Sequence, residues 1–200
     1  MLAWTGRELL GWTSAGGASY RPGRGWRQLP QAPLTGSAAW TGNELIVVSG
    51  RSAAAFTPGS GWRRLPQLPE ARRGANVVWD GSELLVLGGD TAPAQGFAYS
   101  PASDTWRELA PADSGRKGAV AVWTGARLLL WGGQTANAGR FLIPPHGLAY
   151  DPKADSWAPL PQAPLRGRLS PVGVWTGRSL VVWGGDPGFA DGARFTPSPR

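Results

Sequence analysis

Four tryptophans of a recurring series are each followed, at the same distance, by a polar residue. These four polar residues are the first candidates for chemistry. They are Arg51, Asp90, Gln134 and Asp186. A basic group precedes tryptophans of the same series. Its members are Arg72, Arg73, Arg116, Lys117, Arg166 and Arg168. The guanidinium fork pairs with carboxylate or phosphate, so the two groups together could bind an anionic ligand. They could equally bridge neighbouring structural units or face water.

A long, partly apolar segment at 134–147 is a second candidate for binding. It contains Arg140 and the only histidine of the chain, His146. Such a segment could form a lip that binds a partner, or a plug over a channel. A single histidine beside Pro144 and Pro145 is more often a surface residue than a catalytic base. We therefore predict that Arg140 and His146 contribute to ligand binding.

Several kinds of chemistry are excluded by what the sequence lacks. Without cysteine, the chain can form no disulfide, thiolate nucleophile, zinc–thiolate site or iron–sulfur cluster. It also shows no glycine-rich phosphate loop, no carboxylate pattern typical of metal sites and no nucleophile elbow. We expect no metal, no cofactor and no catalytic residue.

A repeat of five copies must position the candidate residues. Each copy begins with a tryptophan, a glycine-containing turn and a short apolar run, and the anchors are Trp4, Trp40, Trp79, Trp123 and Trp175. Asp80-Gly81, and the Thr-Gly dipeptide in the other copies, predict a tight two-residue β-hairpin after each anchor. A repeat of this period indicates one supersecondary unit stacked on itself.

Two further strands follow each hairpin. The third strands end on an aromatic residue with proline two positions later, at Tyr20, Phe56, Tyr99, Tyr150 and Phe195. Fourth strands open on Trp26, Trp62, Trp106 and Trp157. No segment of helical period competes, so the predicted fold class is all-β. Four short strands per unit, repeated radially, are typical of a β-propeller blade.

These residues resemble the kelch repeat of bacterial kelch-like proteins and of the galactose oxidase central domain. Paired glycines precede a tyrosine and then a tryptophan, and Tyr99/Trp106 and Tyr150/Trp157 have the kelch spacing. Tyr20/Trp26 and Phe56/Trp62 are one residue shorter. The resemblance implies a single kelch-type β-propeller domain at 1–200. We expect four full four-stranded blades, at about 1–33, 34–69, 70–113 and 114–165, and a partial fifth at 166–200.

The fifth copy has no tryptophan-bearing fourth strand. The chain is then either an open fragment of a longer propeller or a small ring of five blades, and both alternatives stay open. In either case the third strand at 192–196 would present an unpaired edge. An unpaired edge favours self-association or pairing with a partner segment.

Alternating strand directions sort the loops of a propeller onto two faces. The hairpin turns share one face and are nearly identical in every copy. Loops after the double glycines, at 90–96, 134–147 and 186–192, share the other face and carry the length variation. Because function in repeat folds concentrates in variable loops on a rigid frame, we place the binding site on this variable-loop face.

The leading functional hypothesis is a non-catalytic scaffold that binds a protein or a glycan through the variable-loop face. The resemblance also brings in two enzyme types. Copper galactose oxidase needs a cysteine-linked tyrosine and two histidine ligands, and the absence of cysteine with a single histidine excludes that activity. Sialic-acid epimerases of the kelch type are the alternative, with Asp90 or Asp186 as the base and an arginine for the substrate carboxylate.

Charge and hydropathy limit the partners further. The formal net charge is +7, but the arginines are scattered over every repeat, so we do not expect nucleic acid as a partner. No apolar run is long enough to span a membrane. Met1 already lies in a repeat and no signal peptide is visible, so localisation is open. A missing upstream signal would mean a secreted or cell-envelope protein, and otherwise we expect a cytoplasmic one.

Overall fold

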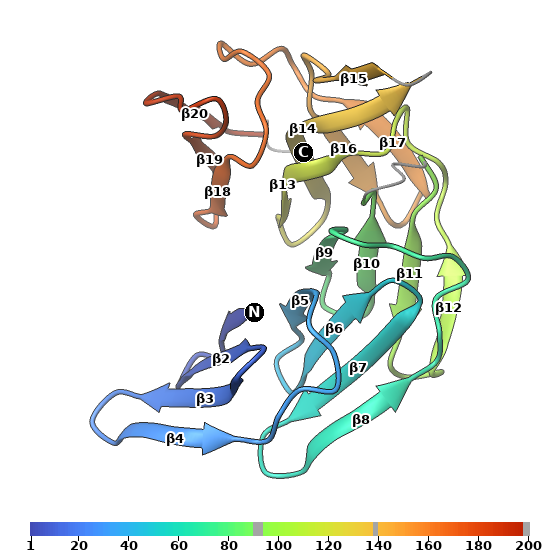
Figure 1. The fold of residues 1–200 in the computed structure, drawn as a ribbon. Coiled ribbons are helices and arrows are strands. Elements are labelled where there is room, and N and C mark those ends of the chain that lie inside the picture. Colours follow the sequence, from blue (N-terminus) through green and yellow to red (C-terminus); the bar gives the residue numbers. More distant parts are fainter. Residues whose placement is uncertain (90–93, 138–139, 198–200) are drawn as a thin grey trace.

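The computed structural model describes residues 1–89, 94–137 and 140–197, and it shows an all-β propeller of five blades (Figure 1). Blade I contains β1 (Leu2–Trp4), β2 (Leu9–Thr13), β3 (Gly16–Arg21) and β4 (Gly25–Leu29). Blade II contains β5 (Ser37–Trp40), β6 (Leu45–Ser49), β7 (Ser52–Thr57) and β8 (Gly61–Leu65). Blade III contains β9 (Asn76–Trp79), β10 (Leu84–Leu87), β11 (Phe97–Ser100) and β12 (Thr105–Glu108). Blade IV contains β13 (Lys117–Trp123), β14 (Leu128–Asn137), β15 (Arg140–Leu142), β16 (Leu148–Asp151) and β17 (Ser156–Pro159). Blade V contains β18 (Val172–Trp175), β19 (Leu180–Trp183) and β20 (Gly192–Phe195).

The predicted all-β propeller is confirmed, but its division into four four-stranded blades and a partial fifth is not quite what the structure shows. Blade IV has an additional strand, because β14 runs on through the segment expected to be a loop and pairs with β15. In the described part of blade V, three strands form the sheet in the order β18-β19-β20. Within the described ranges, no helix is long and apolar enough to cross a membrane.

The hairpin after each anchor tryptophan differs in detail from the predicted two-residue turn. Trp4 pairs with Leu9, so four residues connect the two strands. In this connection the Thr5 hydroxyl accepts the backbone N–H of Glu8, and the Asp80 carboxylate accepts that of Glu83 at the same place in blade III. Thr and Asp therefore stabilise the same turn through a short side-chain acceptor, which explains why Thr-Gly and Asp-Gly interchange between copies.

The core lies between the blades. The inner strands β1, β5, β9, β13 and β18 pack side by side in chain order, and each pair of neighbouring blades encloses an apolar cluster. Trp79 and Trp106 pack in the cluster between blades II and III, and Trp123 and Trp157 pack between blades III and IV. The recurring tryptophans thus join blade to blade, because a planar indole buries a large apolar area at each junction.

The two end blades each leave one broad face unpacked. Trp26 of blade I is 69% exposed and Trp183 of blade V is 59% exposed, whereas Trp12 and Trp131, at the position of Trp183 in blades I and IV, are buried. Over the part of the chain that the structure describes, β18 and β1 lack the packing that joins the other inner strands. Figure 1 shows the blades as an arc in which blade V and blade I are the two ends.

Candidate functional site

The variable-loop face is built on tight contacts where the second strand of one blade ends beside the start of the next blade. Gly50 donates its backbone N–H to the Arg72 carbonyl at 3.0 Å, and Gly133 donates to the Arg168 carbonyl at 2.9 Å. Within blade V, Asp186 donates its backbone N–H to the Leu169 carbonyl at 2.8 Å. These bonds bring the two polar groups of the sequence, after the glycines and before the anchors, onto one face.

The junction between blades III and IV shows why glycine is needed there. Gly88 has a φ of +64°, and a Cβ at this position would lie 2.1 Å from the Arg116 carbonyl oxygen. From the neighbouring strand, Asn76 donates its amide Nδ2 to the same oxygen at 2.8 Å. A side chain at position 88 would therefore push the two blades apart. The glycine fixes the backbone of Arg116 relative to blade III.

Arg72, Arg116 and Arg168 stand at equivalent positions seven residues before their anchor tryptophans, and we call them the junction arginines. All three are almost fully buried. Arg72 donates to the Gln95 carbonyl at 3.1 Å, lies 4.8 Å from the centroid of the Phe97 ring and forms an ion pair with Glu70. A buried guanidinium requires such partners, because an unpaired charge is costly to bury.

Arg168 is paired even more fully than Arg72. Its Nη1 donates to Asp191 Oδ1 at 2.6 Å and to the Gly184 carbonyl at 3.1 Å, and its guanidinium lies 4.2 Å from the Phe189 ring centroid. The hydrogen bond from Arg168 lowers the pKa of Asp191. These side-chain partners all lie within blade V, and the link to blade IV is made by the Arg168 carbonyl, which accepts the backbone N–H of Gly133.

Arg116 leaves more of its hydrogen-bonding capacity unused than the other two, since among the described residues Arg72 lacks a hydrogen-bond partner only at Nε. Its Nη1 donates to the His146 carbonyl at 2.6 Å, and its Nη2 is 3.7 Å from Asp113 Oδ1. Within the described residues, Nε and Nη2 of Arg116 have no hydrogen-bond partner. Burial lowers the pKa of Arg116, and the charge of Asp113 opposes this shift.

Asp113 and His146 cover Arg116 on the outer side and form the exposed part of the site. His146 Nε2 is 2.6 Å from Asp113 Oδ2, and Ser114 Oγ donates to Asp113 Oδ1 at 2.9 Å. The side chains of His146 and Asp113 are 36% and 42% exposed. Partial burial would raise the pKa of Asp113, but the hydrogen bonds from His146 and Ser114 and the charge of Arg116 together lower it. We call these four residues the Asp113–His146 cluster.

The other predicted site residues lie apart from this cluster or outside the description. Arg51 and Arg73 are exposed at the junction of blades II and III, and Gln134 is half-buried opposite Lys117. Asp186 is exposed and paired through its backbone with Leu169. Asp90 lies outside the described residues, and Arg140 belongs to β15, but its side chain is not described.

Sequence reasoning missed Asp113, although a signal was present. An acidic residue stands two or three positions before two of the junction arginines, as Glu70 before Arg72 and Asp113 before Arg116. Each forms an ion pair with its arginine in the structure. In the described residues, no group of three or more His, Cys, Asp or Glu side chains could hold a metal ion.

Comparison with known proteins bears on the fold. No protein-family model matches the chain, and no curated protein matches it in sequence. Among many solved chains of similar structure is one titled "Structure of YjhT", with a TM-score of 0.70 and 16% sequence identity. The match covers 84% of this chain and 68% of that one. The likeness shows a β-propeller fold. At this identity it carries no information on ligand or activity.

Proposed function

We propose that this chain is a kelch-type propeller domain at 1–200 that binds a glycan or a protein through its variable-loop face, without catalysis. The observation that carries the proposal is the Asp113–His146 cluster. It presents a carboxylate and an imidazole to solvent on one of the tightest backbone junctions of the molecule. Beneath them lies a buried cation whose Nε and Nη2 have no hydrogen-bond partner among the described residues. Such groups suit sugar hydroxyls or polar peptide groups.

The rigidity of the cluster supports binding more than catalysis. Asp113 receives hydrogen bonds from Ser114 and His146, and the His146 backbone is held by Arg116. A site whose polar groups are preorganised loses less side-chain entropy when a ligand binds. Asp113, with its lowered pKa, is ionised at neutral pH and so accepts hydrogen bonds from hydroxyl groups.

A second candidate function is the sialic-acid epimerase type, and one observation favours it. The imidazole of His146 is held by a carboxylate, and a carboxylate orients a histidine for proton transfer in many enzymes. In this version His146 would be the base and Arg116 would attract the substrate carboxylate. Of the two residues that the sequence suggested for the base, Asp186 lies apart from this cluster and Asp90 lies outside the described residues.

The test separates the two functions. N-acetylneuraminic acid and galactose are each titrated into the wild-type protein by saturation-transfer NMR, and ring-proton spectra report any turnover. Binding of a sugar without turnover, weakened about tenfold by Asp113→Asn and by His146→Gln, is the expected result. Arg178→Gln, on the hairpin-turn face, is the control and leaves binding unchanged. Turnover of N-acetylneuraminic acid would support the enzyme instead, and no binding of either sugar would overturn the glycan part of the proposal.

A further inference from the structure

At the outer edge of blade V, the described residues form no counterpart of the fourth strand and its tryptophan. The other blades show what such a strand contacts. In blades II, III and IV the third-strand aromatic contacts a fourth-strand tryptophan, with ring centroids 5.3, 5.1 and 5.0 Å apart for Phe56–Trp62, Tyr99–Trp106 and Tyr150–Trp157. In blade V the equivalent aromatic is Phe195 on β20. Over the described residues, no strand pairs with the outer edge of β20.

Two hydrogen bonds recur with the fourth strands of blades III and IV. In blade II, by contrast, Nε1 of Trp62 has no hydrogen-bond partner among the described residues. The indole Nε1 of Trp106 donates to the Pro66 carbonyl of the preceding blade at 2.9 Å, and Trp157 donates to the Ala110 carbonyl at the same distance. Three residues after each tryptophan, a leucine donates its backbone N–H to the carbonyl of the glycine just before the third strand. These bonds run from Leu109 to Gly96 and from Leu160 to Gly147.

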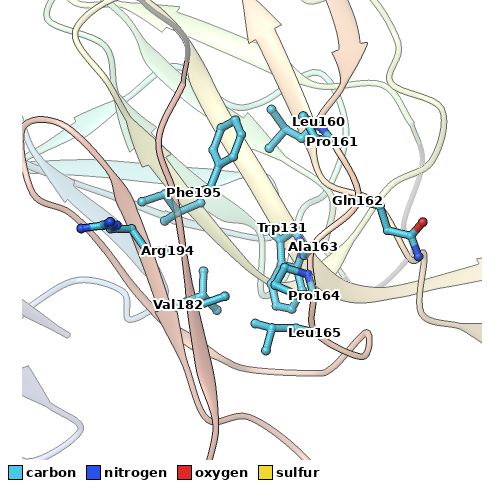
Figure 2. A pocket seen from close by; sticks show the side chains of 12 residues that line it. Trp131, Leu160, Pro161, Gln162, Ala163, Pro164, Leu165, Val182, Arg194 and Phe195 are labelled. Atoms are coloured by element: carbon cyan, nitrogen blue, oxygen red, sulfur yellow. The ribbon is translucent and has the colours of Figure 1, made fainter.

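The acceptors of both bonds have counterparts beside blade V. By position in the repeat, Pro161 corresponds to Pro66 and Ala110, and Gly192 corresponds to Gly96 and Gly147. A cavity of about 200 Å³ lies between blades IV and V and is bordered by Leu160, Pro161 and Phe195. Figure 2 shows Phe195 and Pro161 on opposite sides of this cavity. A second hollow borders the same three residues, so the place of the missing indole is open.

The charges beside the outer edge of β20 favour a different residue after the incoming tryptophan than the charges in the other blades do. In blade III the residue after the tryptophan, Arg107, is paired with Ala98 and reaches Glu83 at 2.6 Å. The positions of Ala98 and Glu83 are occupied in blade V by Arg194 and Ser179. Arg194 is exposed on the edge strand. An arginine after the incoming tryptophan would face Arg194, and like charges directly opposite each other destabilise a sheet.

From these observations we propose that β20 binds an extended polypeptide segment of the form Trp-Glu/Asp-x-Leu as a fourth antiparallel strand of blade V. The indole would lie against Phe195 and donate to the Pro161 carbonyl, the leucine N–H would donate to Gly192, and the acidic side chain would pair with Arg194. Strand addition at an open sheet edge takes affinity from backbone hydrogen bonds and specificity from alternate side chains.

A second copy of this chain does not supply that segment. The four Trp-x-x-Leu segments of the described chain are already paired in blades I to IV. Three of them carry arginine after the tryptophan, at Arg27, Arg63 and Arg107, and the fourth carries Ala158. None has the acidic residue that Arg194 favours, so the occupant is a segment of different sequence.

Synthetic peptides test the proposal directly. The probe is a labelled peptide with the sequence of residues 102–111, in which glutamate replaces Arg107, and its binding to the protein is measured by fluorescence anisotropy. We expect this peptide to bind about fivefold more tightly than the unchanged sequence, from the cross-strand charge pair. Replacing its tryptophan by alanine removes an anchor residue and weakens binding about thirtyfold or more. Slower amide exchange at 192–196 in the complex locates the peptide.

A charge swap provides the matched control. Arg194→Glu is expected to reverse the preference, so that the unchanged, arginine-containing peptide binds more tightly. Arg178→Glu removes the same charge from the hairpin-turn face and leaves the preference as it is. Equal effects of the two variants, or no binding by any peptide, would overturn the proposal. A concentration-dependent dimer that peptide does not dissociate would assign the edge to a second copy and would also overturn it.

Discussion

At the scale of single residues, an aspartate in each of blades III and IV links the third strand to the fourth. Tyr99 donates its hydroxyl to Asp104 Oδ1 at 2.5 Å, and Tyr150 donates to Asp155 in the same way. Asp104 and Asp155 have φ values of 54° and 44°, a left-handed conformation that Asp adopts more readily than most residues. In blades I and II the turn is one residue shorter and uses glycine instead, at Gly23, Gly25, Gly59 and Gly61.

Removing one of these hydroxyls should cost stability at neutral pH. Tyr99→Phe keeps the ring that packs on Trp106 but loses the hydrogen bond to Asp104, so we expect a loss of about 1 kcal/mol in the free energy of unfolding. Urea unfolding followed by fluorescence measures it. Tyr20→Phe, at the exposed equivalent in blade I, is the control and should change stability by less than about 0.5 kcal/mol. Equal losses would mean that the hydroxyl of Tyr99 contributes nothing specific.

The environment of Tyr99 should also make the stability of the fold depend on pH. Burial, and then the hydrogen bond to Asp104, raise the pKa of Tyr99 to about 12, above its value near 10 in an unfolded chain. The folded state therefore favours the neutral hydroxyl. Its contribution to stability is complete below about pH 10 and is lost as the pH rises from 10 to 12. The alkaline loss should be smaller in Tyr99→Phe, and identical profiles for variant and wild type would contradict this account.

At the scale of elements, the position of a tryptophan in the arc decides what it contributes. Trp157 is partly buried between blades III and IV and donates to the Ala110 carbonyl, whereas Trp26, in the same place of blade I, is exposed. Trp157→Ala should destabilise the fold by about 3 kcal/mol or more, and Trp26→Ala by less than about 1 kcal/mol. Thermal and urea unfolding measure both. A large loss for Trp26→Ala would show that a further surface covers blade I.

Much of this architecture could be predicted from the sequence, because its signals repeat. The anchor tryptophans, the turn residues and the third-strand aromatics each recur five times and agree with one another. β15 could not be predicted, since it depends on a hairpin formed by one irregular segment that has no counterpart in the other blades. The loops that differ between copies contain no repeat to guide a prediction.

The candidate site was predictable only in part, for the same reason. His146 and Arg116 were selected from the sequence, but 30 residues separate them and only folding brings the His146 carbonyl to Arg116. The sequence cannot distinguish an exposed arginine such as Arg73 from a buried one such as Arg72, because both precede the same anchor. Which of the two faces solvent is decided by packing against Phe97 and blade III.

Arginines form ion pairs with acidic residues on both faces of the molecule. On the hairpin-turn side, Glu8, Glu44 and Glu83 form ion pairs with Arg27, Arg63 and Arg107. In blade IV the pair is reversed, as Arg127 with Asp151. On the variable-loop side, acidic residues pair with all three junction arginines. The charges of these arginines are therefore balanced by partners within the fold.

At the scale of the whole molecule, a repeated frame carries one irregular face, and the central claim is that ligands bind at the Asp113–His146 cluster on that face. Chemical-shift mapping of the isotope-labelled protein with a bound sugar tests this most directly. The account predicts that the largest amide shifts fall at 113–118 and 142–147, and that Asp113→Asn reduces them at the same sugar concentration. Shifts concentrated in the hairpin turns at 41–44, 80–83 and 124–127 would contradict it.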